Sequence, residues 1–101
     1  MAWTGSNAFA FNRATVNQNT PATSGVYALF NQGVWIYFGE SVNIRDRLLQ
    51  HLTNQENPCV ARANPQFFAF EAVMGQQARI ARQDALIREF WHPGLCNQRL
   101  G

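Results

Sequence analysis

The chain of 101 residues has no lysine, no long apolar run and few charges of either sign. All eight basic residues are arginine, and the formal net charge is only +2, which permits an anionic partner without requiring one. The longest uninterrupted apolar stretches have five residues. Neither a signal peptide nor a membrane-spanning segment is therefore expected, and we predict a cytoplasmic protein with no membrane partner.

Several common site motifs are also missing. Cys59 and Cys96 lack the spacing of a CxxC or Cys/His metal site, and in a cytosolic protein two free thiols are favoured over a disulfide. We find no glycine-rich phosphate loop, no zinc-ligand set and no Ser/His/Asp arrangement. Hydrophobic residues nevertheless make up 47% of the chain, enough for one domain with its own core.

Two short segments, 25–30 and 34–38, are rich in β-branched and aromatic residues and flank the turn signal Asn31-Gln32-Gly33. This pattern is typical of a β-hairpin. A loop centred on Gln32 would place Tyr27 directly opposite Tyr37, with both side chains on one face of the sheet. We therefore expect two phenols side by side.

The next segment, Asn43 to Leu52, has the apolar spacing of an amphipathic helix, with Ser41 as the expected N-cap. Arg47 and His51 are four residues apart, so they lie one turn above each other along the edge of its apolar stripe. A helix packed on the hairpin would bring both side chains to the tyrosine pair, in one cleft.

The remaining segments complete an α+β domain. Residues 1–23 form an N-terminal arm attached by its aromatic side chains, residues 53–65 a surface loop with Arg62 exposed, 67–73 a third strand, and 77–91 a second long helix. The predicted order is strand, strand, helix, strand, helix. It gives a small three-stranded antiparallel sheet flanked by helices over residues 24–101. The aromatic residues of the arm are Trp3, Phe9 and Phe11.

The hairpin and its following helix resemble the GIY-YIG nuclease family. GVY stands at 25–27 and YFG at 37–39, where that family has its two triplets, and Arg47 and His51 follow on the next helix. The resemblance covers roughly residues 24–97 and implies a three-stranded GIY-YIG-like fold. It also implies an endonuclease that hydrolyses phosphodiester bonds in DNA with one divalent metal ion, Mg²⁺ or Mn²⁺, acting as a monomer or homodimer.

The resemblance also implies catalytic roles. Tyr27 would help to activate water, Arg47 would neutralise the phosphate, and Tyr37 would orient water or phosphate. His51 would donate to the phosphate or share in the proton transfer. A free tyrosine titrates near pH ~10, so Tyr27 would act as a base only if the metal or Arg47 favours its phenolate.

Three further residues are candidates for substrate binding: Asn43, Arg62 and Asn97. Asn43 matches a common motif position, but helix capping explains it equally well. Asn97 follows Pro93 as an asparagine follows a proline at the end of the family's domain, although a simple turn role is equally compatible. Arg62 belongs to the loop region that varies in the family, and the resemblance implies that this region would contact substrate.

Gln83 departs from the family pattern. A helical projection at ~100° per residue from Ile80 places it near the middle of the inward-facing apolar arc, where a satisfied core glutamine is the plain interpretation. The resemblance puts it where the family has its metal-binding glutamate. We therefore predict a folded chain that binds nucleic acid but cuts weakly or not at all.

We weigh two origins for the glutamine at position 83 and two functions for the chain. We favour a deliberate glutamate-to-glutamine change in an active enzyme, made to trap a complex, over natural loss of activity. The alternative function is a non-cleaving nucleic-acid-binding module on the same fold.

Overall fold

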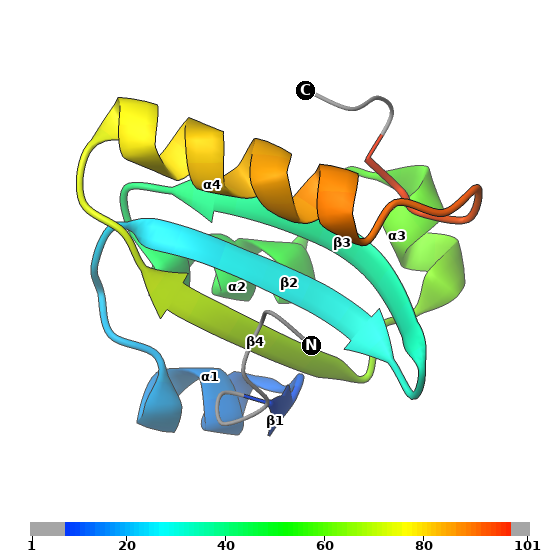
Figure 1. Ribbon diagram of the computed structural model, residues 1–101. Helices are drawn as coiled ribbons and strands as arrows, with labels where there is room; N and C mark the ends of the chain where they lie inside the picture. The colour runs from blue at the N-terminus through cyan, green and yellow to red at the C-terminus, as the bar shows by residue number, and fades with distance from the viewer. Residues whose placement is uncertain (1–7, 98–101) are drawn as a thin grey trace.

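The computed structural model describes residues 8–97, which form one antiparallel sheet with helices on both faces (Figure 1). The spatial order of the strands is β1-β4-β2-β3. Helix α4 covers one face, and α1, α2 and α3 lie against the other. The elements are β1 Phe9–Ala10, α1 Arg13–Asn19, β2 Gly25–Asn31, β3 Val34–Ser41, α2 Ile44–Thr53, α3 Pro58–Ala63, β4 Phe67–Ala72 and α4 Gln76–Glu89.

Alternation along the strands divides the apolar residues into two cores. Tyr27 and Leu29 of β2 point toward α1, α2 and α3, where they meet Leu48 of α2. Val26 and Ala28, the alternate residues, point toward α4. The sheet therefore separates the side chains of α4 from those of α2.

The α+β class and the three predicted strands are confirmed, but the sheet has four strands, not three. The additional strand, β1, pairs Phe9 with Phe68 and Ala10 with Phe67 of β4. Two residues are too few to show strand alternation in a sequence, which explains why the pattern missed it.

The predicted arm also contains a helix that the sequence pattern missed. Helix α1 lies within this arm and places Val16 in the core, so residues 13–19 belong to the folded domain. Phe9 and Phe11 pack against Phe68, as expected of an arm attached through aromatic contacts. Trp3 lies outside the described residues.

The hairpin forms, but the predicted register is wrong. Its loop consists of two residues, Gln32 and Gly33, and Gly33 takes a φ of 77° that favours glycine. The pairing then shifts between Leu29 and Phe30, opposite which β3 carries one extra residue, Ile36. As a result, Tyr27 lies opposite Gly39, and Tyr37 lies opposite Leu29.

The segment 53–65 is not a simple loop, because it contains α3. Asn57 caps this helix by accepting hydrogen bonds from the backbone N–H groups of Cys59 and Val60, and Pro58 occupies its first turn. Asparagine at the N-cap followed by proline is a standard helix start. Arg62 is exposed on α3, as predicted, although on a helix.

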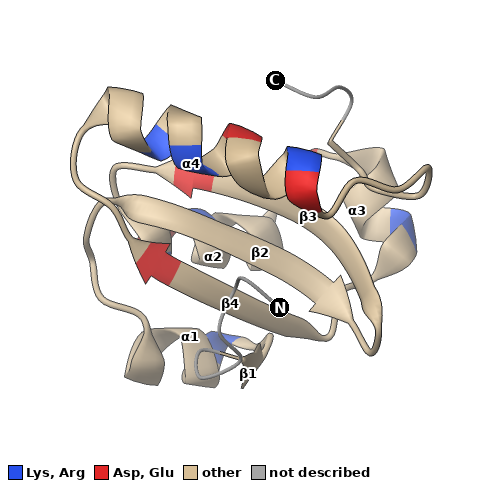
Figure 2. Ribbon diagram, in the orientation of Figure 1, with Lys and Arg blue, Asp and Glu red and all other residues tan. Residues whose placement is uncertain are grey.

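The inward face of α4 differs from the predicted one. Ile80 and Trp91 are 40% and 42% exposed, whereas Arg79 is buried. The stripe of α4 that meets the sheet consists of Arg79, Gln83 and Leu86. A hydrophobic pattern assigns an arginine to solvent and therefore misses the first of these residues. Arg79 is retained there because its Nε donates to Glu40 at 2.8 Å, and Arg82 forms a similar pair with Glu71. Figure 2 shows basic segments of α4 and acidic segments of β3 and β4.

Cys59 and Cys96 form a disulfide bond, so the prediction of two free thiols is wrong. The two residues are 37 positions apart, and their proximity depends on the packing of α3 beside the segment that follows α4 (Figure 1). Such bonds persist mainly in oxidising compartments, so the cytoplasmic location stays a prediction. Within residues 8–97, no helix is long and apolar enough to cross a membrane.

Candidate active site

Tyr27 and His51 form the centre of the candidate site. The phenol oxygen of Tyr27 lies 2.8 Å from Nε2 of His51. Tyr27 reaches this position because its ring passes over Gly39 on the neighbouring strand, where any Cβ atom would overlap the ring. Glycine at 39 is thus required by the ring of Tyr27, which connects the two sequence triplets physically.

Tyr37 and Arg47 complete the predicted cluster. The rings of Tyr27 and Tyr37 have centroids 6.3 Å apart, and the His51 ring lies 5.5 Å from the first and 5.8 Å from the second. Arg47 is one turn before His51 on α2 and donates to the side chain of Gln50 at 3.0 Å. The structure therefore brings together all four residues predicted to be catalytic.

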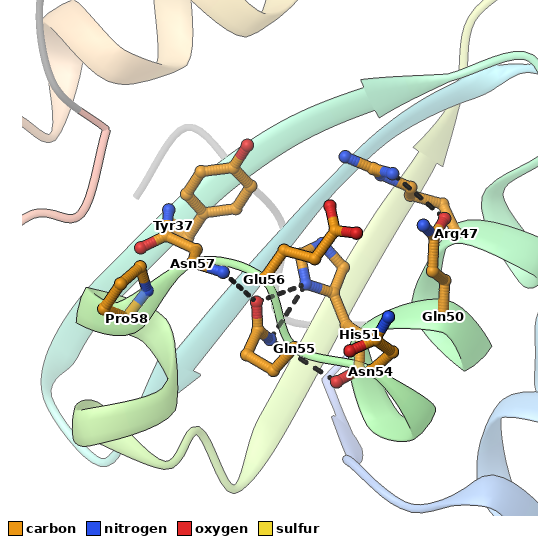
Figure 3. A pocket seen from close by; sticks show the side chains of 9 residues that line it. All are labelled: Tyr37, Arg47, Gln50, His51, Asn54, Gln55, Glu56, Asn57 and Pro58. Atoms are coloured by element: carbon orange, nitrogen blue, oxygen red, sulfur yellow. Dashed lines mark hydrogen bonds between the residues drawn. The ribbon is translucent and has the colours of Figure 1, made fainter.

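Three of these residues open onto a cleft of about 310 Å³ (Figure 3). We call it the tyrosine cleft. Tyr27 is only 1% exposed and is not among its walls, and its hydroxyl contacts His51 and Arg47 from behind them. The lining residues are Tyr37, Arg47, Gln50, His51, Asn54, Gln55, Glu56, Asn57 and Pro58.

Gln55 orients the imidazole of His51. The backbone N–H of Asn57 donates to Oε1 of Gln55 at 3.2 Å, which directs Nε2 of Gln55 toward Nδ1 of His51, 3.0 Å away. Oε1 of Gln55 also lies 3.3 Å from the same Nδ1, so Gln55 holds the ring in either tautomer. Nε2 of His51 and the phenol oxygen of Tyr27 share one hydrogen bond, whose direction follows the tautomer.

Burial governs the protonation states of the cluster. It raises the pKa of Tyr27 well above its usual range, the neighbouring Tyr37 raises it further, and the hydrogen-bonding Arg47 opposes this shift. Burial likewise lowers the pKa of His51 below 6.5, with Gln55 opposing and Arg47 reinforcing the shift. At neutral pH the pair is therefore a neutral phenol and a neutral imidazole.

The remaining cation is Arg47. Contact with the phenol of Tyr27 raises the pKa of Arg47, which keeps its guanidinium charged at every physiological pH. Glu56, at the edge of the tyrosine cleft, adds to this shift. The cleft thus presents a permanent positive charge beside a tyrosine hydroxyl, an arrangement suited to a phosphate group.

Gln83 and Asn97 lie away from the tyrosine cleft, at the outer edge of β3. The side-chain N–H of Gln83 donates to the carbonyl oxygen of Phe38 at 3.1 Å. Asn97 donates to the same oxygen at 2.8 Å and accepts from the N–H of Phe38 at 2.9 Å. Asn97 therefore satisfies the unpaired edge of β3 as a neighbouring strand would.

A divalent cation would need charged oxygen ligands, and the side chains near Gln83 do not offer them. Gln83 directs its N–H group, not an oxygen, at Phe38. The neighbouring carboxylate, Glu40, is paired with Arg79. Within residues 8–97, no group of three or more histidine, cysteine, aspartate or glutamate side chains could hold a metal ion. The residues present do not fit a tightly bound Mg²⁺.

The three predicted substrate contacts are dispersed. The side chain of Asn43, not of Ser41, caps α2 by accepting from the N–H of Asp46. Arg62 lines a second pocket beside α3, together with Asn97. The sequence analysis missed Gln55, although its place four residues after His51 is a signal that could have identified it.

The comparisons with known proteins agree with this geometry. No family model matches the chain. UvrABC system protein C from Hydrogenobaculum sp. (strain Y04AAS1) is 46% identical over 39 residues, which are 39% of this chain and 7% of that protein. The chain thus spans only a small fraction of the curated relative that it matches.

Solved structures match over more of the chain. A tyrosine-to-phenylalanine variant of the GIY-YIG N-terminal endonuclease domain of UvrC from Thermotoga maritima, bound to its catalytic divalent cation, has a TM-score of 0.68 and 25% identity. The match covers 83% of this chain and 96% of that one. The magnesium-bound form of the same domain has a TM-score of 0.63 and 25% identity, over 74% of this chain and 89% of that one.

Proposed function

We propose that this chain, which resembles the GIY-YIG endonuclease domain in fold and in both sequence triplets, belongs to the divalent-metal-dependent DNA endonucleases. The observation that carries the proposal is the contact of Tyr27 with His51 beside Arg47 and Tyr37. We further propose that this chain is a weakened or inactive form, because the resemblance places Gln83 where the family has its metal-binding glutamate.

Phosphodiester hydrolysis requires a bound phosphate, an oriented water and stabilisation of the charge that develops on the phosphate oxygens. Arg47 supplies a fork of N–H donors, whose geometry matches a phosphate. Tyr37, on the opposite wall of the tyrosine cleft, presents a hydroxyl that orients the phosphate or a water. Both groups are in place before any substrate arrives.

Tyr27 and His51 are the two residues of the site that we consider for proton transfer. Because burial keeps Tyr27 protonated, it is a poor general base in this chain. It instead fixes His51 by their 2.8 Å hydrogen bond, and His51 presents its ring to the tyrosine cleft. We propose that His51 moves a proton to or from the reacting groups, with Tyr27 as its buried partner.

A cleavage panel tests the proposal. Single-stranded, duplex and branched DNA, and matching RNA, are incubated with this chain and with Gln83→Glu, with and without Mg²⁺ or Mn²⁺. We expect little cleavage by this chain and metal-dependent cleavage of DNA by Gln83→Glu. If Gln83→Glu binds metal but remains inert on every substrate, the endonuclease proposal is wrong.

The second candidate is a nucleic-acid-binding module that does not cut. The observation that favours it is the hydrogen bond from Gln83 to Phe38, which gives the amide a structural role that a glutamate could not fill. A chain that binds DNA in the panel, but whose Gln83→Glu form neither gains metal affinity nor cuts, supports this candidate.

Substrate contacts outside the tyrosine cleft belong to the same proposal. Arg62 is exposed and can meet a phosphate, and Asn43, at the start of α2, lies on the helix that carries Arg47 and His51. Asn97 would act indirectly, because both polar atoms of its side chain already contact Phe38. Cleavage by a monomer and by a homodimer would both be compatible with these contacts.

A further inference from the structure

The second pocket, which we call the Trp91 pocket, has a volume of about 420 Å³ and lies directly beside the tyrosine cleft. The two pockets share Asn57 and Pro58 among their lining residues, so they are adjacent. The volume is in the range of ~300–1,000 Å³ typical of small-ligand sites. Of its lining residues, the proposed function includes Arg62 and Asn97 but not Trp91.

The lining of this pocket includes one aromatic side chain and one positively charged side chain, Trp91 and Arg62. Trp91, the second residue after α4, is 42% exposed, whereas its neighbour Phe90 is half-buried. Arg62, from α3, supplies the charge among the described lining residues. An exposed indole beside a guanidinium suits a flat, electron-rich ring that is attached to an anion.

The walls of the Trp91 pocket are held in place covalently. Cys59 and Cys96 both line it, and their disulfide joins α3 to the segment that follows α4. The backbone N–H of Cys96 also donates to the carbonyl oxygen of Ile36 at 2.7 Å, which attaches the same segment to β3. The pocket is thus a preformed site, whose ligand need not order it on binding.

We infer that the Trp91 pocket binds an unpaired nucleotide that flanks the phosphate held in the tyrosine cleft. The base stacks on Trp91, and Arg62 pairs with the adjoining phosphate. A base inside a duplex is covered on both faces by its neighbours, whereas an unpaired base can offer a free face to the indole. This inference rests on the proposed function, and it specifies the substrate as DNA with a single-stranded part next to the cleavage position.

Continuity with the tyrosine cleft supports a nucleotide over a protein ligand. A strand whose phosphate contacts Arg47 must leave the cleft past its walls, and the shared wall of Asn57 and Pro58 leads to Trp91. Arg62 then provides the charge that a phosphate backbone requires along this path. A purely apolar protein segment would leave Arg62 without an anionic partner in the pocket.

The test measures binding by fluorescence anisotropy in EDTA, which prevents cleavage. The full chain is titrated with labelled single-stranded DNA, blunt duplex and duplex with a single-stranded flap. We expect tighter binding of the two DNAs with unpaired bases. Trp91→Ala should weaken those two by roughly 5- to 100-fold, the scale of losing one stacked base, and should leave blunt-duplex binding unchanged.

Three variants complete the design. Trp91→Phe retains an aromatic face and should retain most of the affinity, whereas Arg62→Gln should lower affinity and reduce the salt dependence of flap binding by about one phosphate contact. Met74→Ala, which alters another exposed apolar residue (73% exposed), is the control and should bind like the original chain. Circular dichroism compares the fold of every variant.

A second measurement is independent of any loss of stability in Trp91→Ala. Single-stranded DNA should quench the tryptophan fluorescence of the original chain, and most of this quenching should disappear in Trp91→Phe. Quenching that persists in Trp91→Phe, or a Trp91→Ala protein that binds all three DNAs normally, overturns the inference. Equal loss of blunt-duplex binding overturns it too.

Failure of the proposed function has a different signature. In that case the original chain binds none of the DNAs and Gln83→Glu cuts none of them, which removes this inference as well. If DNA is bound and Gln83→Glu cuts it while Trp91→Ala changes nothing, the proposed function stands and only the Trp91 pocket is wrongly assigned.

Discussion

The side chain of Gln83 and the side chain of Asn97 donate to one and the same carbonyl oxygen, that of Phe38, at 3.1 and 2.8 Å. Two donors on one acceptor at an edge strand stabilise the position of β3 relative to α4. A carboxylate at position 83 could not donate, and it would face the Phe38 oxygen with a negative charge. The amide therefore suits this contact, which a carboxylate could not make.

Gln83→Glu should lower stability in the absence of metal by about 1–3 kcal/mol, because a donor is lost and the carbonyl oxygen loses one of its partners. A bound cation would offset the repulsion, so Mg²⁺ or Mn²⁺ should raise the Tm of Gln83→Glu and not that of the original chain. Gln77→Glu, at an exposed position on the same helix, is the control for added charge. Equal responses of both variants to metal would contradict the assignment.

Arg47→Ala should reduce turnover by roughly 10²- to 10³-fold in the Gln83→Glu background, the usual scale for losing one preorganised charge stabiliser. Substrate affinity should fall much less, because the guanidinium acts mainly on charge that develops during the reaction. Single-turnover cleavage separates the two effects. The control is Arg88→Ala, which removes an exposed arginine from α4 and should cut normally. Undiminished cleavage by the Arg47→Ala variant would show that Arg47 has no part in the mechanism.

Tyr27→Phe should cause a large loss of cleavage while the protein stays folded, because it deletes one hydroxyl and keeps the ring over Gly39. The lost partner of His51 Nε2 is the reason for the effect. The measurement compares cleavage rate with Tm in the Gln83→Glu background. A variant with full activity would show that the phenol of Tyr27 has no part in positioning His51.

Protonation of His51 should weaken the fold in acid. Its folded-state pKa is lowered by burial, below the unfolded value of about 6.5. The neutral ring therefore contributes stability that is present above pH ~6.5 and is lost as the pH falls through the folded-state pKa. Urea unfolding at pH values between about 7 and 5 should show this loss. The loss should be smaller in His51→Asn, and an unchanged pH dependence in that variant would assign the effect elsewhere.

Loss of the disulfide should destabilise the domain. The bond closes a loop across 37 positions, for which chain-entropy arguments give about 3–4 kcal/mol. We expect the Cys59→Ser and Cys96→Ser double variant to have a correspondingly lower free energy of unfolding. Dithiothreitol should lower the Tm of the original chain and leave that of the double variant unchanged, and equal sensitivity of both would contradict the bond.

The sequence by itself determined the strands of the hairpin, the helix that carries Arg47 and His51, and the joining of these residues to both tyrosines. These features depend on local alternation and helical spacing, which a linear pattern records directly. The glycine-tyrosine triplets made the pattern specific. They did so because a tyrosine ring lying over a glycine of the neighbouring strand is a steric requirement at one exact position.

Only the tertiary structure decided the register of the hairpin, because a bulge of one residue leaves no trace in the alternation of apolar residues. It also decided which face of α4 is buried, since Arg79 enters the interior through its pairing with Glu40, which lies 39 positions away along the chain. The pairing of Cys59 with Cys96, and the Trp91 pocket that they line, likewise depend on contacts between distant segments. Local patterns cannot report such contacts, because their energies arise only when the segments meet.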